Sequence, residues 1–508
     1  MSIKGRSAEN WAKDNCRRLK GSVLFLLSLA IVSLSQLAHP GPWLDTRDSG
    51  LRVDIERLSS AGFIKVPINT RPLMWSAILN DLETTDIKTL PEPLKNSFTR
   101  LISAGKNATR INSPQRSLRL SAANQTQLLR HFGDSAREQG ELSLRHSAIT
   151  EHFAYNLEVT RAVSPWDDEK THYDNSYFGA VLGNWIGLIG SVERWWGPSW
   201  NSSLILTNNA RPTPGLTLQR NYSDPFELPV LQWLGPWTTS MFITKLDDER
   251  FIDNAKLVGM TVGFRPHQTL EINLRRTAQW GGEGRPESVK SFFELLTGIA
   301  DNCGDISCKS DEPGNQLGGI DIRWDLPWLD GSIYGQTIGE DEAGGLPSRR
   351  AYQVGMQMSL NRPWFEGTVF LEFDETSLKS APSPYNTFYN HSIYRTGYRY
   401  EGRVIGATWD NDSQVTSIGA IGYLANGDKV EARYSFGDIN RDSLDGGPSG
   451  HSISTVGAGL NTLSGKWQRA FLWGELEVEG RYTDQVIDQF GRQEDRLRVA
   501  ASVNYYFY

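Results

Sequence analysis

Residues 496–508 read R-L-R-V-A-A-S-V-N-Y-Y-F-Y, and this last stretch of the chain decides the fold. Apolar or aromatic side chains occupy every second position, and most of the polar side chains lie between them. A period of two is that of a β-strand with one apolar face. The aromatic residues gather at the end of the stretch, as they do in the interfacial girdles of membrane β-barrels.

The same alternation recurs through the chain from about residue 117 onward. It is clearest in residues 270–275, 369–374, 430–436 and 472–481. The expected strands have about 9–11 residues, which is the length that crosses a bilayer when a strand is tilted. No long helical pattern interrupts them, and this favours an antiparallel meander. A soluble sandwich of many strands is the alternative interpretation.

Short and long connections alternate along this part of the chain. We expect short turns at residues such as 235–237 and 464–467, and long connections such as 341–350. Two stretches, about 195–228 and 376–414, are too long for turns, and we interpret each as an external or lumen-filling excursion. The sequence therefore predicts an all-β transmembrane fold, an antiparallel outer-membrane β-barrel of about 18 strands, or about 20 if one excursion is a strand pair.

Composition excludes several other classes of protein. The chain has 508 residues, of which 39% are hydrophobic and 22% charged, with a formal net charge of −7. This hydrophobic fraction is too high for a disordered chain. The acidic balance argues against nucleic acid as the main partner. A polytopic helical membrane protein needs several apolar runs of roughly 20 residues, and the chain has one shorter run, residues 23–34.

The N-terminal part of the chain, residues 1–114, differs in its sequence pattern from the rest. The apolar run follows Arg17, Arg18 and Lys20 and ends in small residues, which predicts a signal peptide over residues 1–38. An uncleaved anchor helix is the alternative. In residues 39–114 apolar side chains recur at helical spacing, so we expect a small periplasmic α-helical domain there. Residues 115–508 would then form the barrel with its long external loops.

The cysteines and the sequence motifs give little indication of a metal site, a cofactor or a catalytic activity. Cys303 and Cys308 are expected to form a small disulfide, because an exported chain meets an oxidising compartment. We expect no metal site and no cofactor. Glu193 and Asp410 could be the paired carboxylates of a glycosidase, but no nucleophile elbow, zinc-binding motif or P-loop accompanies them. The sequence therefore predicts that the protein is not an enzyme.

The two excursions combine aromatic side chains with amide, carboxylate and basic groups. Sugars present C–H faces that stack on aromatic rings and hydroxyls that pair with such polar groups. This composition indicates saccharide binding, although the aromatic residues could equally pack the excursions against the inner wall of the barrel. The candidate saccharide-binding residues are Trp195, Trp196, Trp200, Asn209, Arg211, Tyr389, His391, Tyr394, Trp409 and Asp410.

Two blocks of sequence resemble a known family. Residues 193–220, ERWWGPSWNSSLILTNNARPTPGLTLQR, and residues 389–413, YNHSIYRTGYRYEGRVIGATWDNDS, are similar to the capsule assembly Wzi family. LRVDIERLSSAGFIKVP at residues 51–67 and LRHFGDSAREQGELSL at residues 129–144 also fit. The resemblance implies an outer-membrane barrel of 18 strands, closed on the periplasmic side by helices. It also implies a lectin without catalytic activity that attaches capsular polysaccharide to the cell surface.

The partners that this resemblance implies are capsular polysaccharide or exopolysaccharide, outer-membrane lipid and the polysaccharide export machinery. The location would be the outer membrane of a Gram-negative bacterium. The main alternative is an outer-membrane porin for oligosaccharides. An outer-membrane hydrolase and a purely structural partner of an export complex are two further alternatives.

Overall fold

A computed structural model describes residues 41–297, 314–343, 346–378, 385–441, 451–489 and 492–507. The expected signal peptide at residues 1–38 and the expected disulfide between Cys303 and Cys308 lie outside these described residues. Within the described parts of the chain, no helix is both long enough and apolar enough to cross a membrane.

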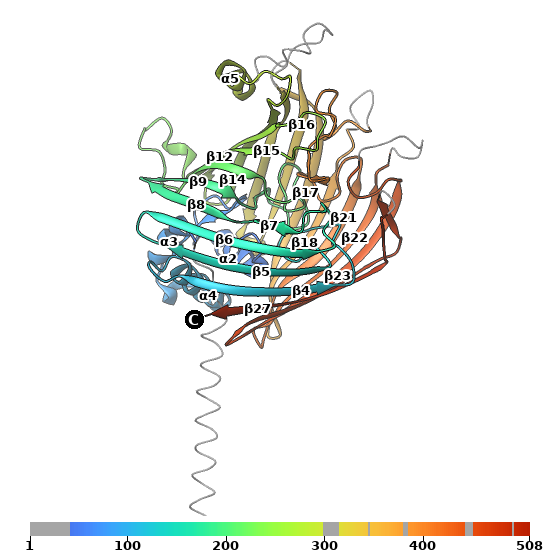
Figure 1. Cartoon of the computed structure of the whole chain (residues 1–508). Coiled ribbons are helices and arrows are strands. Elements are labelled where there is room, and N and C mark those ends of the chain that lie inside the picture. Colours follow the sequence, from blue (N-terminus) through green and yellow to red (C-terminus); the bar gives the residue numbers. More distant parts are fainter. Residues whose placement is uncertain are drawn as a thin grey trace, which may run out of the picture.

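The dominant feature is a closed antiparallel β-barrel (Figure 1). Among the described residues the sheet has 19 segments, and β7 and β8 both pair with β6 as parts of one interrupted strand, so the barrel has 18 strands. The segments are β4 (Gln115–Ala123), β5 (Gly140–Ile149), β6 (Phe153–Val163), β7 (Thr171–His172), β8 (Tyr177–Leu182), β9 (Trp185–Ser191), β11 (Pro214–Arg220), β12 (Trp237–Lys245), β13 (Lys256–His267), β14 (Leu270–Trp280), β15 (Gly314–Leu326), β16 (Gly331–Ala343), β17 (Leu346–Arg362), β18 (Phe365–Glu375), β21 (Gln414–Leu424), β22 (Lys429–Ile439), β23 (Ala458–Phe471), β24 (Gly474–Thr483) and β27 (Leu497–Phe507). The predicted fold class and the strand count of 18 are confirmed.

Alternation along each strand sorts its side chains between lipid and lumen. In β27 Leu497 is 53% exposed on the outer face, whereas Arg498 is 1% exposed and points inward. The same holds in β21, where Ile418 lies outside and Ser417 is buried inside. The apolar residues that a soluble protein would bury therefore face the bilayer here.

The two ends of the barrel differ in the length of their connections. Tight turns such as residues 150–152, 183–184 and 425–428 lie at one end, which we call the short-turn end, together with the longer connection 221–236. Most of the long connections lie at the other end, the external end. Short turns mark the periplasmic side of bacterial barrels. The chain closes on itself by the pairing of β27 with β4, for example Ser502 with Ser121.

Three expected connections are wrong. Residues 464–467 lie inside β23, and the turn follows at residues 472–473, because polar residues that face the lumen do not end a strand. Residues 341–350 belong mostly to β16 and β17. The first excursion ends at residue 213, since β11 is a barrel strand, and residues 221–236 with the short helix η2 (Gln232–Leu234) connect it to β12.

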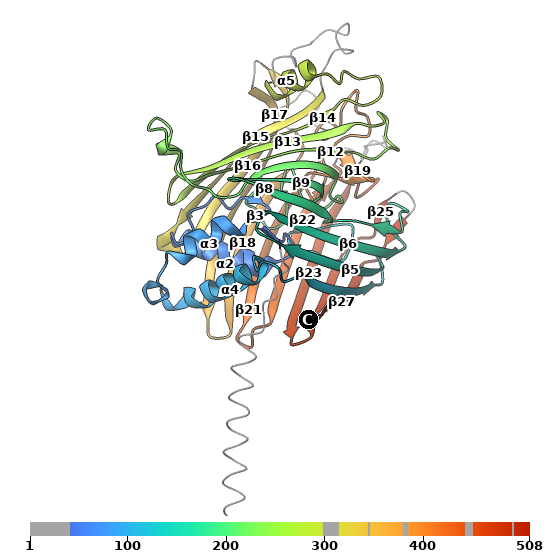
Figure 2. The ribbon, with the colours of Figure 1, turned by 60° about the vertical axis from the view of Figure 1, so that its left-hand side comes forward.

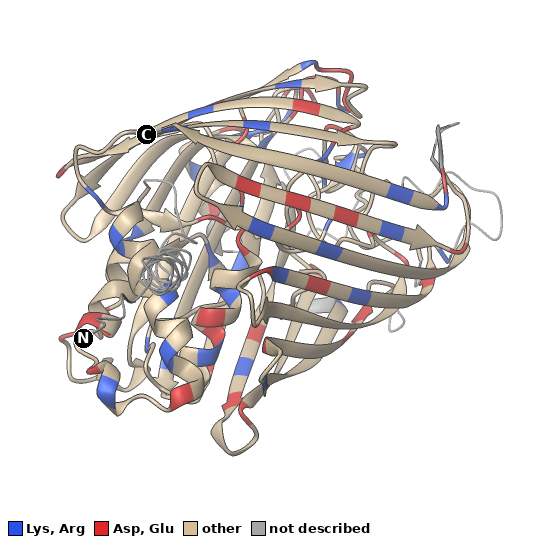
Figure 3. Cartoon of the chain, turned by 90° about the horizontal axis from the view of Figure 1, so that it is seen from below, with Lys and Arg blue, Asp and Glu red and all other residues tan. Residues whose placement is uncertain are grey.

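The N-terminal segment folds into helices at the short-turn end (Figures 2 and 3). They are α2 (Ser49–Ser60), α3 (Trp75–Glu83), η1 (Ile87–Thr89) and α4 (Glu92–Ala108), with short strands β1 (Trp43–Leu44), β2 (Thr70–Arg71) and β3 (Leu73–Met74). The side chain of Asp48 caps α2 by accepting a hydrogen bond from the backbone N–H of Leu51 at 3.0 Å. Every residue of α2 is buried, and the helix contacts β16, β18 and β21 from inside. That the helices form a separate periplasmic domain remains a prediction.

Chain excursions fill the lumen above these helices. Residues 124–139, 192–213, 376–378 and 385–413 enter it. The short strand β10 (Trp195–Trp196) pairs there with β2, and β19 (Arg399–Tyr400) forms a small hairpin with β20 (Arg403–Val404). A buried cluster joins the second and third of these segments, with Leu204, Phe388 and Tyr389 all fully buried. The barrel is thus stabilised by side-chain packing in its lumen as well as by hydrogen bonds between the strands of its wall.

The remaining elements lie in connections. β25 (Ile487–Gln489) and β26 (Arg492–Glu494) pair in the connection between β24 and β27, and η4 (Pro327–Leu329) lies at the turn between β15 and β16. Helix α5 (Val289–Thr297) follows β14 at the external end. Its Leu295 and Phe292 pack beside Trp280 and Val258 of the barrel wall.

Candidate saccharide-binding site

The structure places the ten predicted saccharide-binding residues in the two excursions inside the barrel. Eight of them are buried, and only Arg211 and His391 are partly exposed. The buried eight are Trp195, Trp196, Trp200, Asn209, Tyr389, Tyr394, Trp409 and Asp410. Their side chains contact protein, as the packing alternative required, and direct sugar contact by any of the ten stays untested.

The tryptophans of the first excursion hold it against the barrel wall and the N-terminal helices. The Trp200 indole N–H donates to Oε1 of Gln357 at 2.7 Å, and its backbone N–H donates to Glu372 at 2.7 Å. The guanidinium carbon of Arg52, from α2, lies 3.9 Å from the Trp200 ring centroid. The ring of Trp195 packs edge-on against Phe132 at 5.4 Å.

The second excursion is joined to the first by tyrosine hydroxyls. Tyr389 donates to the carbonyl of Leu204 at 2.5 Å, and Tyr398 donates to the carbonyl of Ile205 at 2.9 Å. Two segments nearly 200 positions apart therefore form one packed body within the lumen.

Glu193 and Asp410, the candidate glycosidase pair, have separate partners. Glu193 accepts from Thr46 at 2.9 Å and from Arg137 at 3.3 Å. Asp410 pairs with Arg399 at 2.9 Å. Burial raises the pKa of Asp410, but the charge of Arg399 outweighs this and the pKa is lowered overall. Both carboxylates thus hold the excursions in place.

Arg211 is the one predicted residue that organises a polar cluster towards the external end. Its three guanidinium nitrogens pair with Asp167 at 2.6 Å, Asp174 at 2.7 Å and Glu138 at 2.7 Å. Burial acts to raise the pKa of Asp174, but the charge of Arg211 outweighs it and lowers the pKa. These contacts connect the first excursion to the connection between β4 and β5, which holds Glu138, and to the one between β6 and β8, which holds Asp167 and Asp174.

A small hollow, which we call the external pocket, adjoins this cluster. Trp166, Asp167, Arg211, Glu401 and Arg403 are among the residues that line it, and its volume is about 10 Å³. The Arg403 guanidinium lies 4.6 Å from the Trp166 ring centroid. Burial and the charges of Asp247 and Asp167 raise the pKa of Glu401 to about 7. Our sequence reasoning missed Trp166 and Glu401, although Trp166 stands in a polar connection that follows β6.

His391 belongs to a second exposed neighbourhood at the external end. Its Nδ1 accepts from the backbone N–H of Ile393 and of Tyr394, both at 3.2 Å. Nearby in the same excursion, the Arg395 guanidinium stacks 4.6 Å from the ring of Phe251, which is 57% exposed. The Phe251 backbone N–H donates to Thr396 at 2.8 Å, so the connection between β12 and β13 is fixed to the excursion.

Fold and site together define an outer-membrane β-barrel whose lumen is filled by its own chain. The family model described as "Capsule assembly protein Wzi" matches residues 109–496. The chain belongs to this capsule assembly family and is an outer-membrane protein.

Comparisons with individual proteins agree with this membership. The chain is 32% identical over 326 residues to an "Uncharacterized 55.8 kDa protein in cps region" of Klebsiella pneumoniae. That match spans 62% of this chain and 61% of the Klebsiella protein. The structure of Escherichia coli Wzi, described as an outer membrane protein involved in group 1 capsule assembly and a carbohydrate binding beta-barrel, superposes with a TM-score of 0.78. The two are 23% identical, over 91% of this chain and 99% of that one.

One further solved structure is less similar. Pseudomonas aeruginosa OprD is 9% identical, with a TM-score of 0.45 over 78% of this chain and 94% of that one.

Proposed function

We propose that the chain binds capsular polysaccharide or exopolysaccharide at its external end and attaches it to the cell surface during capsule assembly. The family match over residues 109–496 carries this proposal. The carbohydrate binding described for Escherichia coli Wzi supports it. The proposed activity is non-covalent capture and needs no catalysis, metal or cofactor. Outer-membrane lipid around the barrel and the export machinery are further proposed partners.

The proposed contact surface has two parts. One is the external pocket with Arg211 and Trp166, and the other is the neighbourhood of His391 with Phe251 and Arg395. Both offer aromatic rings beside charged and amide groups, which suits sugar faces and hydroxyls. The eight buried candidate residues would act indirectly, by holding the excursions that carry this surface.

Retention of a polymer by such a surface would be multivalent. A single contact with one repeat unit is weak, but one polymer meets many barrels, and each further contact is made at high effective concentration. Small losses at each site are therefore expected to release much of the polymer.

The test compares cell-attached with released polysaccharide in the host. Deletion of the gene is expected to leave total polymer unchanged and to increase the released fraction. A chain with Trp166→Ala and Phe251→Ala is expected to restore attachment only partly. Trp328→Ala is the matched control, because Trp328 is 76% exposed at the opposite, short-turn end.

Two outcomes would count against these proposals. Unchanged attachment after deletion contradicts the attachment function. Full attachment with the double variant, at wild-type levels in the membrane, places the contact surface elsewhere.

A further inference from the structure

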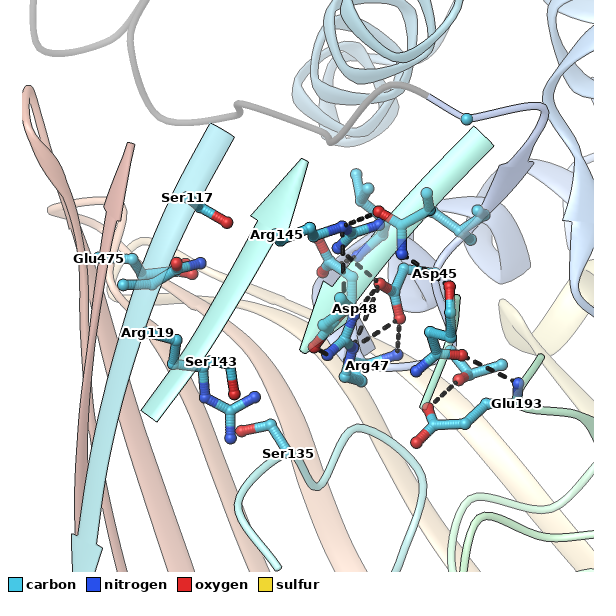
Figure 4. A pocket seen from close by; sticks show the side chains of 18 of the residues that line it. Asp45, Arg47, Asp48, Ser117, Arg119, Ser135, Ser143, Arg145, Glu193 and Glu475 are labelled. Carbon is cyan, nitrogen blue, oxygen red and sulfur yellow. Dashed lines mark hydrogen bonds and ion pairs between the residues drawn. The ribbon is translucent and has the colours of Figure 1, made fainter. Parts of the chain in front are cut away.

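A second hollow, which we call the lumenal cavity, lies at the short-turn end (Figure 4). Its volume is about 180 Å³. It separates residues 41–48 from the inner wall formed by β4, β5, β24 and β27. It extends from Phe471 and Gly474, which flank the turn between β23 and β24, to Ser135 and Glu193 deeper in the lumen. It is separate from the external pocket.

Small side chains on the wall leave this space open. Ser117 of β4, Ser143 of β5 and Ser502 of β27 face it where longer side chains would fill the gap to the N-terminal segment. Ser143 is bonded to Thr160 at 2.8 Å. Within the described part of the chain, the hydroxyls of Ser117 and Ser502 make no side-chain hydrogen bond.

Two further polar atoms at the cavity are also unpaired among the described residues. The Oδ1 atom of Asn504 and the Nε atom of Arg119 are buried and have no hydrogen-bond partner. Neither atom is accessible to solvent, so the free groups that the cavity offers to an occupant are the two serine hydroxyls.

Most of the charged side chains that line the cavity are ion-paired within the protein, and Glu477 accepts a hydrogen bond from Ser135 at 2.9 Å. Arg47 pairs with Asp45 at 2.8 Å and with Glu158 at 3.0 Å, and Lys429 pairs with Asp48 at 3.3 Å. An ionic occupant would have to compete with these pairs. The free groups are suited to a neutral occupant that both donates and accepts hydrogen bonds.

The volume of the cavity and the aromatic rings that line it further limit the kind of molecule that can bind there. The centroids of the Trp43 and Tyr177 rings lie 4.5 Å apart. Tyr506 of β27 also lines the cavity, and its hydroxyl accepts a hydrogen bond from the amide of Asn504 at 3.0 Å. At about 15 Å³ for each water-sized group, 180 Å³ holds roughly a dozen such groups. That is close to the number of non-hydrogen atoms in one hexose ring with its substituents.

We propose that the lumenal cavity binds one neutral sugar unit, with free hydroxyl groups, from the short-turn side of the barrel. The hydroxyls of Ser117 and Ser502 pair with the hydroxyls of the sugar, beside the aromatic rings. The unit is either a free monosaccharide or the end of a glycan chain, since both present the same groups. The site does not depend on polymer binding at the external end.

The test titrates full-length purified protein in detergent with glucose, galactose and mannose, observed by saturation-transfer NMR. At least one sugar is expected to bind saturably, with a dissociation constant on the order of millimolar for a ligand of this size. Ser117→Leu with Ser502→Leu fills the cavity and is expected to weaken binding at least tenfold. Ser117→Leu alone fills part of the cavity and tests the site if the double variant does not fold.

Controls separate this site from the external end. Trp166→Ala with Phe251→Ala removes the contribution of the external end, and the saturable binding that remains is expected to be lost when the cavity substitutions are added. A reducing-end-blocked trisaccharide that competes with the monosaccharide identifies a glycan end as ligand, and failure to compete identifies the free sugar. Absence of saturable binding by all three sugars, or binding that survives both cavity variants, overturns the proposal and leaves the cavity to water.

Discussion

At the scale of single residues, ion pairs between buried side chains stabilise the interior of the barrel. Arg211 shows the pattern, because one side chain that is 10% exposed joins three carboxylates from two different connections of the barrel. Removing one member of such a buried set leaves the others unpaired, and that is where the cost arises.

Arg211→Ala is therefore expected to destabilise the protein by about 3–5 kcal/mol, since Glu138, Asp167 and Asp174 would lose their shared cation. Thermal unfolding in detergent measures this. Lys245→Ala removes an exposed pair with Asp248 and should change stability by less than about 1 kcal/mol. Equal effects of the two substitutions would refute the role given to Arg211.

Glu401 makes stability depend on pH. Its folded-state pKa of about 7 lies above the usual value of 4.5 because burial, Asp247 and Asp167 oppose its charge. Between these two values the unfolded chain loses the proton and the folded chain keeps it, so stability falls as pH rises through this window.

Glu401→Gln is thus expected to raise the unfolding temperature at pH 8 more than at pH 4.5. Glu83→Gln, at an exposed position of α3, is the control and should show no such difference. A pH profile of Glu401→Gln that parallels the wild type would show that Glu401 is not responsible.

The residue types at the site were predictable, but their exposure was not. The sequence places Trp195, Trp200 and Tyr389 in two long excursions, and it cannot say whether an excursion turns outward or into the lumen. The difference depends on partners far away in the chain, such as Gln357 for Trp200 and Leu204 for Tyr389. Local pattern carries no information about those contacts.

At the scale of elements, α2 shows which structural features the spacing of apolar residues can predict and which it cannot. The spacing of Leu51, Ile55 and Leu58 predicts a helix, and the structure has one at Ser49–Ser60. The polar face of a surface helix would meet water, but here Glu56 accepts from Arg323 of the barrel wall at 3.1 Å. The charges of Arg52 and Arg323 outweigh burial and lower the pKa of Glu56 to about 2. The lumen of a membrane barrel is polar, so a helix inside it keeps its charges.

Helices α3 and α4 pack closely at Gly105. A Cβ atom there would lie 2.7 Å from Leu79 and 3.0 Å from Trp75. Gly105→Val is expected to destabilise the protein by about 1–3 kcal/mol through overpacking, although a glycine inside a helix is otherwise unfavourable. Gly480→Ala, where no atom lies within 4 Å, is the control for chemical denaturation of both variants. A neutral Gly105→Val would mean that the two helices can separate without cost.

At the scale of the whole molecule, the filled lumen distinguishes this barrel from the porin alternative. Porins keep a water-filled channel, whereas residues 124–139, 192–213 and 376–413 occupy the interior here, within the described part of the chain. Strand number was predictable because turn and strand lengths are local. The filling was not, because it depends on contacts between distant segments.

The purified protein is therefore expected to give no steady conductance in a planar bilayer, with a general porin as the positive control. A stable conductance as large as that of the control porin would contradict a filled lumen and would support the alternative function, an oligosaccharide porin. Reconstituted protein that binds polysaccharide without conducting would agree with the proposed attachment function.

The pairing of β27 with β4 sets an order of events during biogenesis. Those strands are the last and the first of the barrel, so the ring becomes continuous only when the end of the chain reaches its partner. Helix α2 is enclosed by that ring and precedes β4 in the chain. Once the seam is sealed the wall offers no gap for a helix, so α2 is either already inside the ring at that moment or enters it through the short-turn end.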